Sequence, residues 1–218
     1  MRRTSGFTLI ELMVTVAMIG IVAALAIPTM RAATKNASVN SVSFDLLLRL
    51  QGLKTRALAD QRTYVAVFVD APANDGSGCS SVFSGRCARL FILQEPTTAW
   101  LLKDFVPSSP GTNANVREII DLGRGIRFAK PEKAGLGTPQ PFGTTITTFD
   151  TAASATCDTR SCMAVRFSPN GDVFVEGPDG TLRARRGIAL GLAGAADANE
   201  ARGLLIASPS GIIKAWGL

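Results

Sequence analysis

The feature that most constrains this chain is an apolar segment near its N-terminus that contains a single carboxylate. Residues 7–27 are almost all apolar, small or helix-forming, Glu11 is the one charged residue among them, and Pro28 ends the run. A helix of this length spans roughly 30 Å, which is the thickness of the hydrocarbon core of a bilayer. The sequence therefore predicts a helix that can cross a membrane.

The charge of Glu11 helps to decide between the alternative explanations of this apolar segment. A secretory signal peptide accounts for Arg2 and Arg3 followed by an apolar stretch, and a plain membrane anchor accounts for the length. Neither accounts for Glu11, because a carboxylate inside such a stretch costs roughly 2.5–3.5 kcal/mol on insertion scales. The segment also lacks a convincing small-x-small cleavage site. An intramembrane carboxylate indicates a functional residue with a partner.

The sequence Gly6-Phe7-Thr8-Leu9-Ile10-Glu11-Leu12 resembles the leader-cleavage signal of type IV prepilins and type II secretion pseudopilins. The resemblance implies that a prepilin peptidase cuts between Gly6 and Phe7 on the cytoplasmic face. It also implies that the new Phe7 amine is methylated, that the apolar helix is kept, and that Pro28 lies where this family often has a helix-kinking proline.

A physical argument supports a role for Glu11 in assembly. Cleavage creates a cationic amine at Phe7, and in a low-dielectric helix bundle an anion and a cation attract strongly, while each is costly alone. The Phe7 amine of a neighbouring subunit can therefore neutralise Glu11 and set the axial register. Arg2 and Arg3 are expected to stay cytoplasmic by the positive-inside rule. We thus expect a single-pass protein of the bacterial inner membrane, with its globular domain in the periplasm and later in a pilus or pseudopilus.

After Pro28 the apolar residues recur at helical spacing, and beyond Tyr64 the pattern changes to short β-like runs. The helical stripe consists of Val39, Val42, Leu46, Leu50, Leu53 and Ala57, and we expect it to pack on a sheet. The predicted strands are Tyr64–Val69, Arg89–Leu93, Trp100–Val106, Arg117–Leu122, Ile126–Ala129, Thr144–Phe149, Met163–Phe167, Val173–Glu176, Arg185–Leu190, Leu204–Ala207 and Ile212–Trp216. Asn170-Gly171 predicts a hairpin turn.

These patterns predict an α+β fold, in which a long N-terminal transmembrane helix packs on an antiparallel β-sheet domain, as in pilins. The expected divisions are a leader peptide at 1–6, a transmembrane and assembly helix at 7–30, an amphipathic continuation of the helix at 31–60, and a β-rich globular domain at 61–218.

The chain has four cysteines, Cys79, Cys87, Cys157 and Cys162, and no histidine. No pair has the CxxC spacing and no histidine can complete a zinc site, so the cysteines do not predict a metal centre. In an oxidising compartment they are expected to form two local disulfides, Cys79–Cys87 and Cys157–Cys162. The alternative is four free thiols.

Little else in the sequence indicates a catalytic or ligand-binding site. Lysine and arginine number 23 against 17 acidic residues, an excess of +6 that identifies no partner. No nucleophile elbow, P-loop or metal-binding spacing is present, which predicts neither an enzyme nor a bound cofactor or metal. The densest basic cluster is Arg183, Arg185 and Arg186. It is interpreted as a solvated strand edge that discourages edge pairing, or alternatively as a contact for nucleic acid or an acidic partner.

Two C-terminal stretches, Val165-Arg166-Phe167-Ser168-Pro169-Asn170-Gly171 and Leu204-Leu205-Ile206-Ala207-Ser208-Pro209-Ser210-Gly211, resemble the FimT/GspH group of pilin-like proteins. This resemblance implies a minor pilin or pseudopilin that helps to initiate or cap a filament. It implies other major and minor pilins or pseudopilins, the prepilin peptidase and the inner membrane as partners.

Some members of this group serve DNA uptake through a C-terminal Gly-Arg-x-Arg element. This chain has Gly211-Ile212-Ile213-Lys214 there, which weakens the alternative of a DNA-binding minor pilin for natural transformation. The choice between a type IV pilus and a type II secretion pseudopilus stays open.

Overall fold

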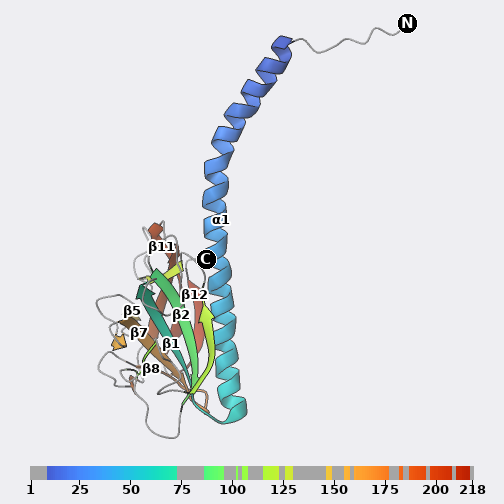
Figure 1. The fold of residues 1–218 in the computed structure, drawn as a ribbon. Helices are drawn as coiled ribbons and strands as arrows, with labels where there is room; N and C mark the ends of the chain where they lie inside the picture. Colours follow the sequence, from blue (N-terminus) through green and yellow to red (C-terminus); the bar gives the residue numbers. More distant parts are fainter. Residues whose placement is uncertain are drawn as a thin grey trace. The chain divides into compact units, whose positions relative to one another are not determined.

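The computed structural model describes residues 9–72, 86–95, 102, 105–107, 115–122, 126–129, 146–148, 155–157, 160–176, 182–183, 187–194, 197–207 and 210–216. The chain divides into two compact units, residues 1–38 and residues 39–218. The elements are α1 (Leu9–Asp60), β1 (Tyr64–Pro72), β2 (Arg86–Gln94), β3 (Asn115–Asp121), β4 (Ile126–Ala129), β5 (Ile146–Thr148), β6 (Ala155–Cys157), β7 (Arg160–Phe167), β8 (Val173–Glu176), β9 (Leu182–Arg183), β10 (Gly187–Gly194), β11 (Asp197–Ala207) and β12 (Ile212–Trp216). A helix followed by sheets confirms the predicted α+β fold (Figure 1).

The first part of α1 is apolar on all sides. Residues Leu9–Ala26 have a mean hydropathy of 2.4 and none of them is buried within the chain, so this segment is long and apolar enough to cross a membrane. Pro28 lies within α1, so the helix does not end where the apolar run ends. The kink expected at Pro28 stays a prediction.

The second part of α1 packs on the sheets with the predicted stripe. Leu46, Leu50 and Ala57 are fully buried, Val39 and Leu53 are nearly so, and Val42 packs against the same core. The helix ends at Asp60, as the pattern predicted.

A capping arrangement stops the helix at this point. Gln61 has a φ of 52°, which is the left-handed conformation that often ends helices. The backbone N–H of Arg62 donates to the carbonyl of Ala57 at 3.3 Å, and the Gln61 side chain donates to the carbonyl of Leu58 at 2.7 Å. These bonds satisfy carbonyl groups that the helix end leaves without partners.

The first sheet has its described strands in the order β3-β2-β1-β7-β8-β9, with β6 paired to β7, and all of these pairs are antiparallel. The predicted hairpin joins β7 to β8. Its turn is closed by the N–H of Gly171, which donates to Ser168 O at 3.0 Å, and Gly171 has a φ of 90° that favours glycine.

The second sheet has the order β12-β11-β10-β4, with β5 also paired to β10. The β5–β10 pair is parallel, whereas the other pairs among the described strands are antiparallel. The predicted strand at Trp100–Val106 is wrong where the structure describes it. Leu102 lies in a short 3₁₀ turn, and Phe105 and Val106 belong to no strand, because the N–H of Phe105 donates back to Leu102 O at 3.1 Å and turns the chain.

Two apolar clusters hold the second unit together. The inner cluster joins the stripe of α1 to one face of both sheets. The outer cluster lies on the other face of the first sheet. The central strand β1 contributes Ala66 and Phe68 to the inner cluster and Val65 and Val67 to the outer one. Both faces of β1 are therefore buried, which explains its nearly continuous apolar sequence.

Candidate functional site

The predicted assembly residue Glu11 lies in the first described turn of α1. The backbone N–H groups at the start of a helix favour a carboxylate, so this position lowers the cost of a charge among apolar residues. Gly6 and Phe7, the predicted cleavage and methylation residues, lie outside the described residues. The pairing of Glu11 with a Phe7 amine therefore stays a prediction.

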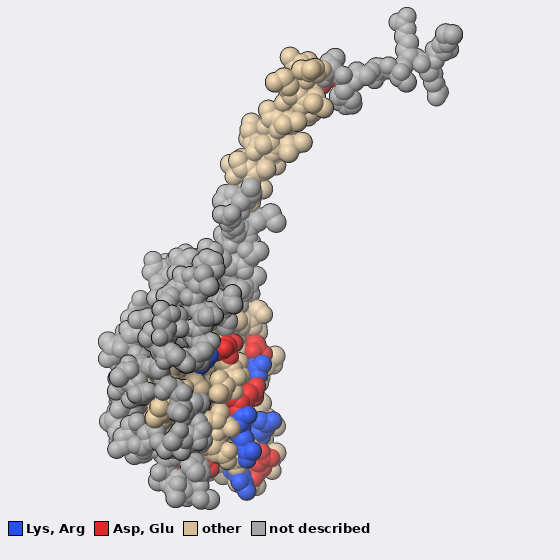
Figure 2. Space-filling model, in the orientation of Figure 1, with Lys and Arg blue, Asp and Glu red and all other residues tan. Residues whose placement is uncertain are grey.

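The side chains around Glu11 form an uncovered apolar surface. The large apolar residues of this segment are between 53% exposed at Val14 and 77% exposed at Leu9. The one described polar side chain that follows Glu11 is satisfied within the helix, because Thr15 Oγ1 donates to Leu12 O at 2.8 Å. Figure 2 shows this part of α1 as a largely uncharged surface. Such a helix needs either lipid or apolar protein around it.

A second exposed apolar surface lies on α1 within the second unit, and the sequence analysis missed it. Phe44 is 50% exposed and Leu48 is 65% exposed. By helical periodicity they lie opposite the buried stripe of Leu46 and Leu50. Their spacing of four residues was the available signal. We call this surface the outward helix face; its described residues are Ser41, Phe44, Leu48, Gln51, Gly52 and Thr55, all exposed and uncharged.

Gly52 on the outward helix face has no explanation in the folded chain. A Cβ atom added there would meet no heavy atom within 4 Å. Glycine in an exposed helix interior costs about 1 kcal/mol relative to alanine. Gly52 therefore slightly destabilises the helix without serving a contact inside the folded chain. Its missing side chain would only let a neighbouring molecule come closer to the helix backbone.

Two cations of α1, Arg49 and Lys54, are engaged in internal contacts. Arg49 bonds to Asp45 at 2.7 Å and to Glu118 of β3 at 2.8 Å. The hydrogen bond with Asp45 is the main cause that raises the pKa of Arg49, with burial opposing it. Lys54 donates to the carbonyl of Ser210 at 3.0 Å and so ties α1 to the β11–β12 turn. Among the residues of this unit that Figure 2 colours, acidic and basic side chains lie intermixed rather than in a patch of one sign.

The C-terminal element that departs from the DNA-uptake pattern has a structural role. Gly211 has a φ of 63°, and an added Cβ would lie 2.6 Å from Val173 Cγ2. The two arginine positions of the Gly-Arg-x-Arg pattern correspond to Ile212, which is 44% exposed and uncharged, and Lys214, whereas Ile213 at the x position packs in the inner cluster. Lys214 is exposed.

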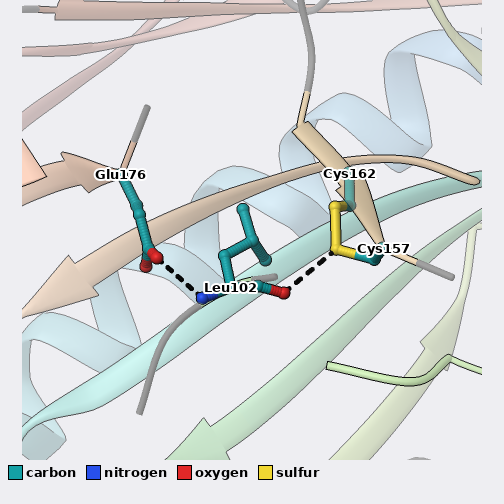
Figure 3. The surroundings of a disulfide bond; sticks show 4 residues. All are labelled: Leu102, Cys157, Cys162 and Glu176. Carbon is teal, nitrogen blue, oxygen red and sulfur yellow. Dashed lines mark hydrogen bonds between the residues drawn. A yellow bond between two sulfur atoms is a disulfide. The ribbon is translucent and has the colours of Figure 1, made fainter. Parts of the chain in front are cut away.

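Cys157 of β6 and Cys162 of β7 form a disulfide, with their Cα atoms 5.9 Å apart, in the pairing that the sequence predicts. Figure 3 shows the bond beside Leu102, and both cysteines are fully buried. Cys79 and the side chain of Cys87 lie outside the described residues, so the second predicted disulfide stays a prediction.

A buried ionic cluster lies near the disulfide and could not be predicted from the sequence. Arg166 of β7 donates to Glu176 of β8 at 3.0 and 3.2 Å and also binds Glu95. Glu176 in turn accepts the backbone N–H of Leu102 at 2.6 Å. The fully buried carboxylate thus has charged and neutral donors, as burial requires.

The remaining predicted site is the arginine cluster. Arg183 ends β9, but its side chain, Arg185 and Arg186 lie outside the described residues. Among the side chains that the structure describes, no group of three or more His, Cys, Asp or Glu residues has an arrangement that could hold a metal ion.

Comparisons with known proteins give one match at the N-terminus and one over a longer region of the chain. Residues 1–27 match the prokaryotic N-terminal methylation motif. A fimbrial protein of Moraxella nonliquefaciens is 37% identical over 138 residues, which are 62% of this chain and 83% of the fimbrial protein. No solved structure matches the chain. The matched motif contains Glu11 and the apolar part of α1.

Proposed function

This chain belongs to the type IV pilin-like proteins, and on that basis we propose that it is a minor pilin or minor pseudopilin. In this role it is a structural subunit that helps to initiate or cap a type IV pilus or a type II secretion pseudopilus. The proposal is carried by one observation above all: α1 presents an uncovered apolar surface with a carboxylate in its first described turn. The pilin-like family is structural rather than enzymatic.

The apolar part of α1 explains how one segment serves two environments. In the membrane its exposed side chains are covered by lipid, and in a filament they are covered by the helices of other subunits. Since lipid tails are as apolar as leucine, the hydrophobic effect does not favour one state over the other. A specific polar contact can favour one of these two states over the other, and the proposed pair of Glu11 with a neighbouring Phe7 amine supplies that contact.

The outward helix face supports the same function in the second unit. Phe44 and Leu48 expose apolar area where the chain itself offers no cover, and Gly52 leaves room for a close approach. We assign this face to contact with another pilin-like subunit during assembly. The DNA-uptake alternative has less support, because Arg49 and Lys54 are engaged internally and the first arginine position of the Gly-Arg-x-Arg pattern is held by the uncharged Ile212.

The proposed role of Glu11 is tested by replacing it with glutamine, which keeps the shape and removes the charge. The variant is expected to insert into the membrane at least as well as the wild type, since a neutral side chain is less costly there. It is also expected to be incorporated into filaments or initiation complexes at least tenfold less, the loss that corresponds to about 1.4 kcal/mol.

The measurement compares the membrane-inserted amount with the amount that co-purifies with other pilins. Glu11→Asp, which keeps the charge, serves as the control and should retain part of the incorporation. Normal co-purification of Glu11→Gln would contradict the proposal. Loss of the protein from the membrane would show instead that Glu11 acts in insertion.

A further inference from the structure

The apolar part of α1 has a second polar side chain one helical turn after Glu11. Within Leu9–Ala26, Glu11 and Thr15 are the only residues with polar side chains. Residues four apart lie on the same face of a helix, with Cβ atoms about 5–6 Å from each other. Helical side chains lean toward the N-terminus, so Thr15 leans toward Glu11. The carboxylate and the hydroxyl therefore share one small polar area on an otherwise apolar surface.

The hydroxyl of Thr15 uses its hydrogen within the helix and keeps an acceptor for another molecule. Oγ1 donates to the carbonyl oxygen of Leu12 at 2.8 Å. A hydroxyl has one hydrogen and two acceptor lone pairs, so this bond leaves the oxygen able to accept from a further donor. Hydrogen bonds in a chain also polarise one another, which makes a donating hydroxyl a better acceptor. Thr15 is exposed in the chain, so a donor on another molecule can reach it.

Neither packing nor insertion into a membrane explains the hydroxyl of Thr15. Valine has nearly the same shape and no polar atom, and it occupies both neighbouring positions, Val14 and Val16. Further along the same face, Met18 and Ile19 are apolar and more than 60% exposed. The hydroxyl adds nothing to such an apolar surface. Its place beside the one carboxylate of the segment points to a polar partner that both groups share.

The proposed partner of Glu11 has a donor for each of the two groups. A protonated, methylated amine carries two N–H groups, which diverge from a tetrahedral nitrogen. Inside an apolar helix bundle no water is at hand, so a cationic N–H group without an acceptor is costly. A nitrogen that lies about 2.9 Å from each of two acceptors fits side chains whose Cβ atoms are about 5–6 Å apart.

We propose, resting on the function proposed above, that Glu11 and Thr15 together bind the Phe7 amine of a neighbouring pilin-like subunit. Glu11 neutralises the charge and accepts one N–H, and Thr15 Oγ1 accepts the other. A lone charge attracts from every direction, whereas a hydrogen bond to a fixed hydroxyl has a preferred direction. Thr15 therefore narrows the axial position at which the neighbouring subunit docks.

The Thr15→Val variant tests this role, because it removes the hydroxyl and keeps the shape. The full-length chain is produced in cells, and the membrane-inserted amount is compared with the amount that co-purifies with other pilins. Thr15→Val is expected to insert as well as the wild type and to be incorporated about threefold less, a loss typical of one interhelical hydrogen bond in a membrane. Thr15→Ser keeps the hydroxyl and should be incorporated like the wild type.

The matched control moves the hydroxyl without changing the composition, in the paired variant Thr15→Val with Val16→Thr. Position 16 lies about 140° around the helix from Glu11. We expect this variant to be incorporated as poorly as Thr15→Val. Normal incorporation of the paired variant, or a loss in Thr15→Ser equal to that in Thr15→Val, would refute the shared binding of the amine.

Mass spectrometry of the N-terminal peptide shows whether each variant is processed. Thr15→Val is expected to lose its leader like the wild type. A Thr15→Val chain that keeps its leader would show that the hydroxyl acts in processing, which would overturn its role in binding the amine.

A double variant shows whether Thr15 acts together with Glu11. Two residues that serve one contact are not additive, so adding Thr15→Val to Glu11→Gln should lower incorporation by less than about 1.5-fold. A further loss of about threefold would place the contact of Thr15 elsewhere and refute the shared binding. If Glu11→Gln is impaired and Thr15→Val is not, only the role of Thr15 is wrong. If Glu11→Gln itself is incorporated normally, the charge pair is wrong and the role of Thr15 falls with it.

Discussion

Glu11 and Tyr64 show how single polar groups gain their importance from their surroundings. Glu11 stands among apolar side chains that are more than half exposed, so its charge is tolerable only with a partner. Tyr64 stands where α1 meets β1 and is 5% exposed, and its hydroxyl donates to Asp60 Oδ2 at 2.5 Å. In our proposal the first group serves contacts between molecules, whereas the second fastens the end of α1 within one molecule.

The contact between Tyr64 and Asp60 can be tested through the stability of the protein at alkaline pH. The hydrogen bond to Asp60, followed by burial, raises the pKa of Tyr64. A folded-state pKa above the unfolded value means that the stabilisation is present below about pH 10 and is lost as the pH rises through the folded-state pKa. We expect the free energy of unfolding to fall more steeply above pH 10 in the wild type than in Tyr64→Phe.

Denaturant unfolding across this pH range measures the difference. Tyr64 is the chain's one tyrosine, so the absorbance of tyrosinate also reports its titration directly. An unshifted tyrosine titration in the folded protein, or parallel stability curves for the two proteins, would contradict the assignment.

At the scale of the element, α1 carries two different exposed surfaces and one buried stripe. The buried stripe follows the usual amphipathic pattern. The outward helix face does not, because Phe44 and Leu48 are exposed and Gly52 weakens the helix without an internal reason. Both departures have the same explanation if another subunit covers this face.

The Gly52→Ala variant separates the effects on folding and on assembly, because alanine should raise the stability of the fold and impair assembly. Alanine at an exposed helix position is expected to raise the free energy of unfolding by about 0.5–1 kcal/mol. The added methyl group is expected to reduce incorporation into filaments or initiation complexes, since it separates two closely packed surfaces. Thermal or denaturant unfolding and co-purification with other pilins measure the two effects.

Thr55→Ala is the matched control. Thr55 is exposed on the same face, and alanine there also raises helix propensity, but it removes bulk instead of adding it. It should stabilise the fold and leave incorporation intact. If Gly52→Ala assembles as well as Thr55→Ala, the outward helix face is not a close contact.

The elements also show which parts of the fold the sequence can specify. The bounds of β4, β8 and β12 agree with the prediction, because each is a short apolar run with turn residues beside it. The structure extends β11 back to Asp197, well before the predicted start at Leu204, and the register of its pairing with β10 is irregular there. The strand predicted near Leu102 is wrong for another reason. Its apolar side chains serve to cover a sheet rather than to join one.

Long-range polar contacts were beyond the reach of the sequence analysis. Arg166 and Glu95 lie 71 residues apart and meet only because β1 brings their strands into register. The predicted apolar helix, its carboxylate and the local Cys157–Cys162 pair depended only on neighbouring residues. Local patterns therefore predicted the apolar helix, whereas the exposure of Phe44 and Leu48 could be recognised only in the packed structure.

At the scale of the whole molecule, the charge of the chain bears on the DNA-uptake alternative. The net charge of +6 is modest, and two described cations of α1, Arg49 and Lys54, are engaged internally. Nonspecific DNA binding depends on phosphate neutralisation and falls steeply with salt. We expect the detergent-solubilised chain to bind DNA weakly or not at all at about 150 mM salt.

Fluorescence polarisation with labelled duplex DNA over a range of salt concentrations tests this expectation. Any binding at low salt should disappear when Arg183, Arg185 and Arg186 are replaced by alanine. Micromolar binding at physiological salt that the triple replacement abolishes would favour the DNA-uptake alternative instead.

We propose above all that the chain is processed and then packed by α1 into a filament or its initiation complex. The most direct measurement is mass spectrometry of the N-terminal peptide from purified filaments or initiation complexes, beside the membrane fraction of the same cells. We expect the assembled chain to begin at a methylated Phe7, and Gly6→Val to remain in the membrane with its leader attached. A chain that is confined to the membrane fraction with Arg2 and Arg3 still present in the wild type would contradict the account.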